Sequence, residues 1–218
     1  IGEAPPVLGG WATRLKHEVF AGQAIAVRGA AGHFPAYWDV EKWSAMMLGG
    51  PDFATEVPPS RWQHDDYYDP DPDSWQRRKI FARHGSFIDG VELFDHRAFS
   101  ITEAEATVMD PNQRHVLEVA YEALLSAGHQ RNLLFGRACG TYVGHAMPEW
   151  ALARQQDCGR FGHTGMTPPI ASNRISYTLG TRGPSMTIDT EQASSLTALY
   201  MASESVLHKG RAEACEMS

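Results

Sequence analysis

The chain has 218 residues and a formal net charge of −7, with 43% hydrophobic and 21% charged residues. This composition is ordinary for a globular protein, and the length supports one sizeable core or two small ones. The acidic balance argues against general nucleic-acid binding, and no apolar run reaches the length of a membrane span. The chain begins with Ile1 and has no secretory signal, so we expect a piece of a longer, cytoplasmic product.

Three cysteines, Cys139, Cys158 and Cys215, are too few and too scattered for a disulfide framework. No two of them form the close pair that a zinc site of the CxxC type needs. A reduced, intracellular setting fits this pattern best.

Residues 1–21 carry paired prolines and glycines, and we predict a linker or leader there. The apolar run 24–29 predicts a buried strand that ends at Gly29. A helix is predicted from Trp38 to Leu48, where Gly49, Gly50 and Pro51 end it.

Residues 51–90 are predicted to be rich in loops. Alternating aspartates at 65–73 suggest a calcium loop, but that loop needs Gly at position 74 and Glu at position 80. The chain has Ser74 and Ile80, so a solvated acidic loop is the better interpretation. The basic cluster 77–79 with Arg83 could meet an acidic partner, although a solvated loop explains it as well.

Two helix starts are marked by capping residues. Ser100 with Glu103 fits a capping box. Asp110 precedes Pro111, and Gln113 lies where a reciprocal cap belongs. The second helix then continues with apolar residues at helical spacing until Gly128 ends it.

A strand of small residues is predicted at 138–144, where Cys139 serves as a buried apolar filler. Four histidines, His33, His64, His84 and His145, show no metal-ligand spacing and are interpreted as surface or core residues. Strands that alternate with helices predict an α/β fold.

The segment 183–196 predicts a short buried strand that continues directly into a helix, a junction where α/β enzymes present a nucleophile. Apolar residues at 196, 199, 200, 206 and 207 predict the buried face of this helix, and Gly210 is expected to end it. Gln192 is therefore expected near the helix N-terminus, where unpaired N–H groups favour negative charge. A Cys at this place would have a lowered pKa and would attack thioesters.

The segments 171–180 and 182–190, together with 109–114 and 117–124, closely resemble the β-ketoacyl synthase (ketosynthase) domains of modular polyketide synthases. Three segments nearer the N-terminus also match the family, in the same order along the chain: Arg61-Trp62, the run 68–72 and Phe94-Asp95. Residues 22–218 are thereby identified as the N-terminal part of such a domain, about half of the catalytic unit.

The resemblance implies a thiolase-like, layered α/β/α fold and a dimer formed through the strand at roughly 185–189. It also implies an acyl carrier protein as partner, whose phosphopantetheine arm brings the substrate; no cofactor is expected to bind directly, and no metal. The partner subunit would be a second copy or another ketosynthase. Half of a layered fold should expose apolar surface, so we expect the 218 residues alone to be poorly soluble or to bind a hydrophobic dye.

The resemblance places the family's catalytic Cys at Gln192, with Thr190, Glu191, Ala193 and Ser194 as its neighbours. The family's two catalytic histidine motifs, which lie in the C-terminal half, are not found in these 218 residues. An amide is a very poor nucleophile, so Gln192 cannot hold an acyl chain. Decarboxylation of a malonyl thioester needs only a pocket that stabilises the enolate, and this reaction can persist.

Three functions remain open at this point. The first is a non-condensing decarboxylase, whose family run is typically Ala-Gln-Ser-Ser-Ser. The second is an inactive partner of the chain-length-factor type, typically Glu-Gln-Ala-Gly-Gly, which residues 191–193 resemble locally. The third is a condensing enzyme in the wider protein with Ser194 or Ser195 as nucleophile, although capping and packing explain these serines better.

Two further features have structural interpretations beside functional ones. Glu191 could be a buried carboxylate with a raised pKa, or a hydrogen-bonded structural residue. Asn173 and Arg174 resemble a family signature that orders the approach to the active-site strand, and they are not taken as catalytic.

Overall fold

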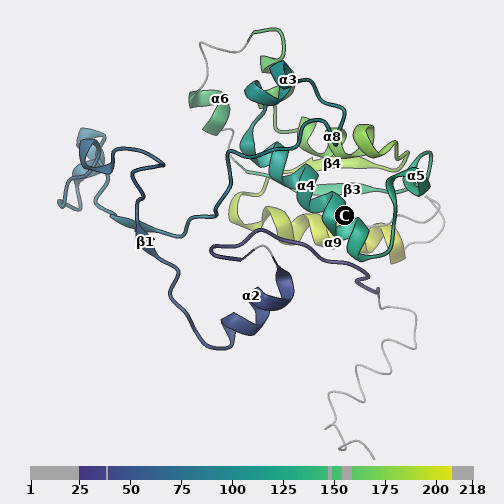
Figure 1. The fold of residues 1–218 in the computed structure, drawn as a ribbon, viewed down its shortest axis with the longest axis horizontal. Helices are drawn as coiled ribbons and strands as arrows, with labels where there is room; N and C mark the ends of the chain where they lie inside the picture. Colours follow the sequence, from purple (N-terminus) through teal and green to yellow (C-terminus); the bar gives the residue numbers. More distant parts are fainter. Residues whose placement is uncertain (1–24, 38, 147–148, 154–158, 208–218) are drawn as a thin grey trace, which may run out of the picture. The chain divides into compact units, whose positions relative to one another are not determined.

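A computed structural model describes residues 25–37, 39–146, 149–153 and 159–207 (Figure 1). The predicted linker 1–21, Cys158, Cys215 and the predicted helix end at Gly210 lie outside the described residues. The chain divides into two compact units, one of residues Ala31–Leu93 and one of the residues on either side of it. The candidate site belongs to the second of these units.

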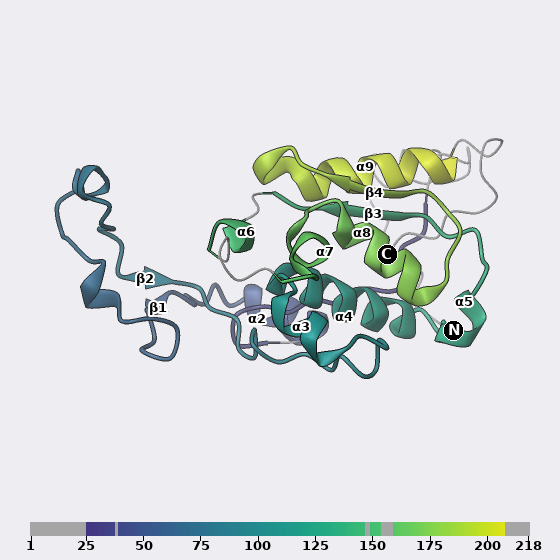
Figure 2. The ribbon, with the colours of Figure 1, turned by 90° about the horizontal axis from the view of Figure 1, so that it is seen from above.

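Three layers form the second unit. The strands β3 (Thr141–Gly144) and β4 (Ser185–Ile188) pair in parallel, with Thr141 opposite Ser185. Helix α9 (Ser194–Leu207) covers one face of this pair, and α4 (Pro111–Ser126) and α8 (Ile170–Leu179) lie on the other (Figure 2). Parallel neighbours need a long crossover, which α8 helps to supply between β3 and β4. The predicted layered α/β arrangement is confirmed.

Helix α4 begins and ends as the sequence predicts. The Asp110 carboxylate accepts a hydrogen bond from the Asn112 backbone N–H at 2.8 Å, and Pro111 occupies the first helical position. At the other end, Gly128 takes a φ of 85°, a conformation that glycine adopts readily. The predicted reciprocal cap is wrong, because the buried Gln113 side chain instead donates to the Thr167 carbonyl and accepts from Arg174.

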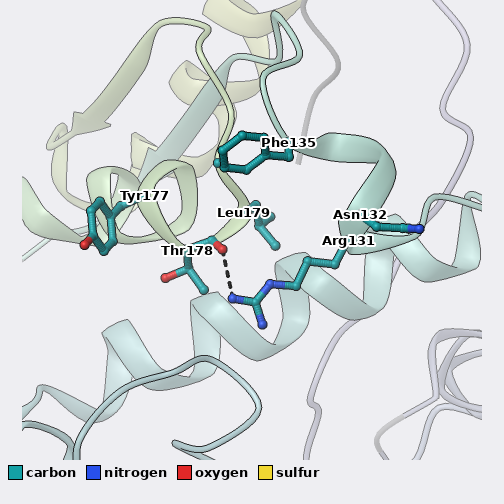
Figure 3. A pocket seen from close by; sticks show the side chains of 7 residues that line it. Arg131, Asn132, Phe135, Tyr177, Thr178 and Leu179 are labelled. Carbon is teal, nitrogen blue, oxygen red and sulfur yellow. Dashed lines mark hydrogen bonds between the residues drawn. The ribbon is translucent and has the colours of Figure 1, made fainter.

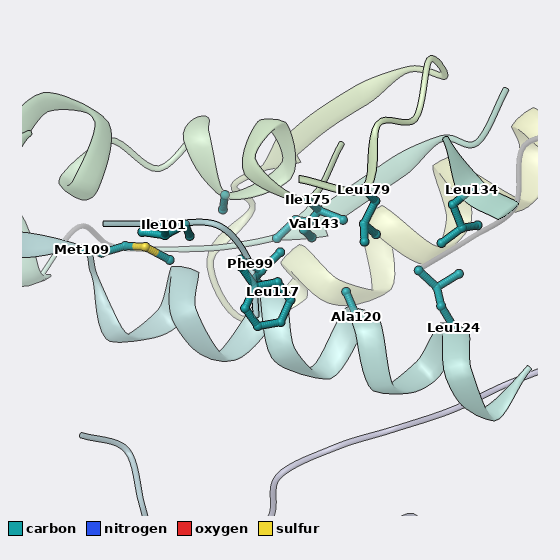
Figure 4. Packing of buried hydrophobic residues seen from close by; sticks show 11 residues of the cluster. Phe99, Ile101, Met109, Leu117, Ala120, Leu124, Leu134, Val143, Ile175 and Leu179 are labelled. Atoms are coloured by element: carbon teal, nitrogen blue, oxygen red, sulfur yellow. The ribbon is translucent and has the colours of Figure 1, made fainter. Parts of the chain in front are cut away.

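The main apolar cluster fills the space between α4, α8 and β3 (Figure 4). Leu117 and Met109 are 0% exposed there. Burial of this kind stabilises a fold by about 1.5–3 kcal/mol for each large side chain. The cluster comprises Phe99, Ile101, Met109, Leu117, Ala120, Leu124, Leu134, Val143, Ala171, Ile175 and Leu179.

Helix α9 packs on the sheet through the opposite face from the one predicted. Its buried residues are Ser194, Ala198 and Ala202, which let the helix approach β3 closely. A Cβ built on Gly144 would lie 2.5 Å from the backbone of Ser194, so only glycine fits at that strand position. Three of the side chains expected inside face outward instead, with Leu196 70%, Leu199 50% and Tyr200 63% exposed, whereas Val206 and Leu207 are half-buried.

Two other predictions of local structure are wrong. The run expected as a buried strand has no regular structure over residues 25–29, and Val27 is 74% exposed. It lies instead against the end of α4, where the Ala30 N–H donates to the Ser126 hydroxyl. The capping box expected at Ser100 with Glu103 is wrong, because the cap of α3 (Glu103–Val108) is Thr102, whose side chain accepts from the Glu105 N–H.

Shorter helices complete this unit: α5 (Arg131–Leu134), α6 (Glu149–Ala153) and α7 (Gly162–Met166). Cys139 precedes β3 and is 3% exposed, which confirms the predicted buried filler. Of the described stretches, none is a helix both long and apolar enough to cross a membrane.

The unit Ala31–Leu93 is rich in loops, as predicted. It holds α2 (Val40–Met47), the two-residue strands β1 (Thr55–Glu56) and β2 (His84–Gly85), and the short 3₁₀ turns η1 (His64–Asp66) and η2 (Ser74–Arg77). Asp39 caps α2, and helix 38–48 was thus predicted to within two residues. The basic cluster is not a free cationic patch, because Arg77 binds the carboxylates of Asp69 and Asp71, each at 2.8 Å.

Candidate active site at the strand-to-helix junction

The predicted junction is confirmed. Strand β4 ends at Ile188, and the chain turns through Asp189 and Thr190 into the 3₁₀ turn η3 (Glu191–Ala193), which continues directly into α9. The turn lies at the carboxyl edge of a parallel strand pair, the edge at which open α/β sheets bind their ligands. Strand β4 itself is half-buried rather than buried as predicted.

Short hydrogen bonds fix the shape of this turn. The Asp189 carboxylate accepts from the Glu191 N–H at 3.0 Å. The Ser194 hydroxyl accepts from the Thr190 N–H at 2.9 Å and donates to the Glu191 carbonyl at 2.6 Å. Ser194 is 5% exposed, so the structural role that the sequence favours for it is confirmed. A hydroxyl committed to two backbone groups is poorly available as a nucleophile.

Glu191 adopts a left-handed backbone conformation with a φ of 53°. Residues other than glycine and asparagine take this conformation at a cost, and such positions cluster at functional sites. The Glu191 side chain is exposed, so the alternative of a buried carboxylate is wrong.

Gln192 is the exposed middle residue of η3, two residues before Ser194, the first residue of α9. The structure therefore brings together the residues predicted for the site: Thr190, Glu191, Gln192, Ala193 and Ser194. The unpaired N–H groups at the start of a fourteen-residue helix attract a developing negative charge at this point. The arrangement can stabilise an oxyanion or an enolate beside Gln192.

Arg174 holds together the helices behind the junction. Its guanidinium is nearly buried and contacts the Glu105 carboxylate at 2.6 Å, the Gln113 amide oxygen at 3.2 Å and the Thr164 carbonyl at 3.2 Å. These contacts join α8 to α3, α4 and α7. Asn173 accepts a hydrogen bond from the hydroxyl of Ser185, the first residue of β4, at 2.9 Å, so Asn173 links α8 to the start of β4.

His145 and Asp110 form a buried pair that the sequence did not single out. His145 follows β3 directly, and its Nε2 lies 4.0 Å from Asp110 Oδ2. The two side chains are 6% and 3% exposed. The one signal in the sequence for this pair is the position of His145, one residue beyond a predicted strand. No group of three metal-ligating side chains occurs within the described ranges.

A recess of about 550 Å³ lies away from the junction, beside the end of α8 that precedes β4 (Figure 3). Arg131, Phe135 and Tyr177 line it, with Asn132, Thr178, Leu179 and Gly180. The Arg131 guanidinium is committed to the carbonyls of Ala98 and Thr178. This recess adjoins the amino end of β4, which is the wrong edge of a parallel sheet for ligand binding.

A helix that starts directly after a parallel strand, at the carboxyl edge of a layered α/β fold, is where α/β enzymes of many classes bind their ligands. The family model for the beta-ketoacyl synthase N-terminal domain matches residues 22–215. The chain therefore belongs to the β-ketoacyl synthase family, and it represents the N-terminal domain.

Curated relatives are polyketide synthases. The mycocerosic acid synthase-like polyketide synthase of Mycolicibacterium smegmatis is 39% identical over 194 residues, which cover 87% of this chain and 9% of that protein. The polyketide synthase ThaG of Burkholderia thailandensis is 36% identical over 192 residues, covering 87% and 3%. The chain thus spans a small part of the relatives it matches.

Solved structures agree with this assignment. The oxazolomycin ketosynthase domain OzmH KS7 of Streptomyces albus JA3453 matches with a TM-score of 0.77 and 32% identity, covering 86% of this chain and 32% of that one. The ketosynthase from module 6 of the bacillaene synthase of Bacillus subtilis 168 matches with a TM-score of 0.69 and 30% identity, covering 83% and 29%. These neighbours confirm the predicted thiolase-like fold.

Proposed function

We propose that the protein containing this chain is a non-condensing ketosynthase that decarboxylates a malonyl thioester carried by an acyl carrier protein. The observation that carries the proposal is Gln192 on the exposed turn before α9, where the family resemblance places the nucleophilic Cys. Membership of the ketosynthase family supports the substrate class, since thioesters are what a nucleophile at this turn would attack.

The chemistry of the side chain limits what the site can do. An amide does not form an acyl-enzyme, so condensation through Gln192 is excluded. Gln192 does offer an NH₂ donor, and the start of α9 offers backbone donors. Such donors stabilise the enolate that forms as the malonyl group loses CO₂.

The partners follow from the same proposal. The phosphopantetheine arm of an acyl carrier protein would deliver the thioester to the turn at Gln192. This delivery would take place in the cytoplasm. A second copy, or another ketosynthase, would pair with the chain along β4. Strand β4 pairs with β3 on one side, and the strand order among the described residues places it at the edge of its sheet.

Malonyl-loaded carrier protein tests the proposal directly. The full-length protein should convert it to acetyl-carrier, which intact-protein mass spectrometry detects by the loss of CO₂. A Gln192→Ala variant should decarboxylate more slowly, because it removes the side-chain donor. The backbone donors at the start of α9 stay in place. Conversion no faster than in the absence of enzyme would contradict the proposal.

A second candidate is a structural partner of the chain-length-factor type, which shapes the tunnel of an active ketosynthase. It is favoured by the run Glu191-Gln192-Ala193 and by the exposure of all three side chains on the turn. Co-expression with a separate ketosynthase distinguishes the two: a structural partner should change product length without producing acetyl-carrier on its own.

The third candidate, condensation in the wider protein through Ser194 or Ser195, finds least support. Ser194 is buried and bonded to two backbone groups, and Ser195 follows it inside α9. A Gln192→Cys variant that takes up an acyl group, where the wild type does not, would exclude a serine nucleophile.

A further inference from the structure

The left-handed backbone of Glu191 needs a group that holds it. Its φ of 53° lies in a region that glycine and asparagine adopt much more readily than glutamate. The Glu191 side chain is exposed, so burial does not impose this conformation. A neighbouring residue must therefore stabilise it.

Asp189 supplies the stabilising bond. Its Oδ1 accepts a hydrogen bond from the Glu191 N–H at 3.0 Å. A carboxylate bonded to the N–H two residues ahead closes a small ring, which restricts the backbone between the two residues. Within residues 189–194, Glu191 is the residue with a positive φ, and this bond acts directly on it.

The conformation of Glu191 decides where the next amide points. The peptide that joins Glu191 to Gln192 is planar, so the φ and ψ of Glu191 set the direction of the Gln192 N–H. The neighbouring amides are already bonded: Thr190 N–H donates to the Ser194 hydroxyl at 2.9 Å, and Ala193 N–H donates to the Thr190 carbonyl at 3.2 Å. For the Gln192 N–H, the described residues provide no acceptor. A donor is thus left free on the exposed turn.

We propose that Asp189 is a positioning residue of this site. By holding Glu191 in the left-handed conformation, it fixes the direction of the Gln192 N–H and the point from which the Gln192 side chain leaves the turn. The inference rests on the proposed function, in which donors at this turn stabilise an enolate. Such donors are effective when they are fixed before the charge develops. Asp189 acts through the backbone and takes no part in bond breaking or proton transfer.

The first test measures the conversion of malonyl-carrier to acetyl-carrier by the full-length protein. Asp189→Ala should lower kcat by about 10- to 100-fold, the scale of loss when a reacting group is slightly misplaced. KM should change little, because the lost interaction belongs to the transition state. Asp189→Asn keeps an oxygen acceptor in the same place and should retain most of the rate.

A second substitution separates positioning from a general loss of stability. Glycine adopts the left-handed conformation without assistance. In a Glu191→Gly background, Asp189→Ala should therefore lower kcat much less than it does in the wild-type background. Asp52→Ala is the matched control, because Asp52 makes the same bond to the Ala54 N–H at 2.9 Å in the other unit, and Ala54 has no positive φ. It should leave the rate unchanged.

The second test does not depend on decarboxylation. In a Gln192→Cys background of the full-length protein, the pH profile of alkylation by iodoacetamide, followed at residue 192 by peptide mass spectrometry, reports how well the turn stabilises a thiolate. At a helix start the thiol pKa falls below the value of about 8.5 for free cysteine. Asp189→Ala should move the profile toward that value, whereas Asp189→Asn should not. Both variants remove the same charge, so their difference isolates the hydrogen bond.

The outcomes separate the two proposals. A folded Asp189→Ala protein with the wild-type kcat would overturn the positioning role while leaving the decarboxylase intact. Equal losses in Asp189→Ala and Asp189→Asn would also overturn it, since charge rather than the bond would then be responsible. Wild-type protein that does not decarboxylate would overturn the proposed function. The alkylation profile would then decide the role of Asp189: a shift in Asp189→Ala alone supports it, and an unmoved profile overturns it.

Discussion

The two units of the chain are stabilised in different ways. Both buried apolar clusters found in the described residues lie in the layered unit, between the strand pair and its helices. In the unit Ala31–Leu93, by contrast, Ser74 is the one described residue that is buried. That unit relies on turns, stacked rings and exposed ion pairs, such as Phe34 on Trp43 and Arg77 with Asp71. Replacing a side chain of the same kind should therefore lower the free energy of unfolding much more in the layered unit than in the unit Ala31–Leu93.

Two arginines test this contrast most strongly. Arg174→Met leaves the Glu105 carboxylate and the Gln113 amide without their buried partner, so it should lower the free energy of unfolding by about 3–5 kcal/mol. Urea unfolding followed by circular dichroism measures the loss. The matched variant Arg77→Met breaks exposed ion pairs, which contribute little, and should leave the midpoint unchanged. Equal losses in the two variants would show that the contrast is wrong.

Two leucines give the next largest effect. Leu117 is 0% exposed at the centre of the main cluster, and Leu117→Ala should cost about 3 kcal/mol through lost burial and a cavity. Leu93, in the other unit, is 61% exposed, and Leu93→Ala should change the urea midpoint little. A Leu117→Ala midpoint indistinguishable from that of Leu93→Ala would contradict the assignment of the core.

The hydroxyl of Ser194 at the junction should contribute less to the free energy of unfolding than the side chains of Arg174 and Leu117. Ser194→Ala leaves the Thr190 N–H without its acceptor, at a cost of about 1–3 kcal/mol. Thermal unfolding measures the change, and hydrogen exchange at Thr190 should quicken. Ser195→Ala is the control, because the Ser195 side chain is exposed. If the two alanine variants behave alike, Ser194 does not fix the turn.

The outward face of α9 should affect solubility more than stability. Leu196, Leu199 and Tyr200 lie exposed on one helix, so the chain of residues 1–218 should bind a hydrophobic dye. Leu199→Glu should reduce the dye fluorescence. Leu133→Glu changes an equally exposed leucine on α5 and should reduce it less. Absence of dye binding by the unmodified chain would show that this face is covered.

The smallest effect concerns pH in the loop-rich unit. Hydrogen bonds from Arg77, and then from the Asp73 N–H, hold the pKa of Asp71 below its usual value of 3.8. The contribution of this contact is therefore complete above about pH 4 and is lost as the pH falls through the lowered pKa. An acid titration followed by the fluorescence of Trp75, in the same turn, should show a change below pH 4. In Arg77→Met the change should move to higher pH; an unmoved change would exclude Arg77 as its cause.

Local capping and turn chemistry made much of the fold predictable. Asp110, Pro111 and Gly128 define the ends of α4, and the strand-to-helix junction at 188–194 lies where the sequence placed it. Each of these signals depends on a few neighbouring residues, so no tertiary information was needed. The family resemblance supplied the layered arrangement, which local patterns alone leave open.

Tertiary contacts decided what could not be predicted. The face of α9 was misassigned because the strand pair accepts small side chains at close approach, and Ala198 and Ala202 pack there instead of Leu196 and Leu199. The run 25–29 is apolar enough for a strand but lies along α4 without a strand partner. Likewise, His145 and Asp110 are far apart in sequence, and only the folded chain brings them within 4.0 Å.

The parallel pairing of β3 with β4 also has a consequence for how the chain folds. Thr141 pairs with Ser185, and the whole crossover, including α7 and α8, must be synthesised before any of these bonds can form. Closing so long a segment is entropically costly and slows folding relative to local helix formation. We therefore expect α4 to form early on the ribosome and the turn at Gln192 to be among the last parts of this chain to assemble. During that interval the unpaired β3 is the segment most exposed to misfolding and chaperone binding.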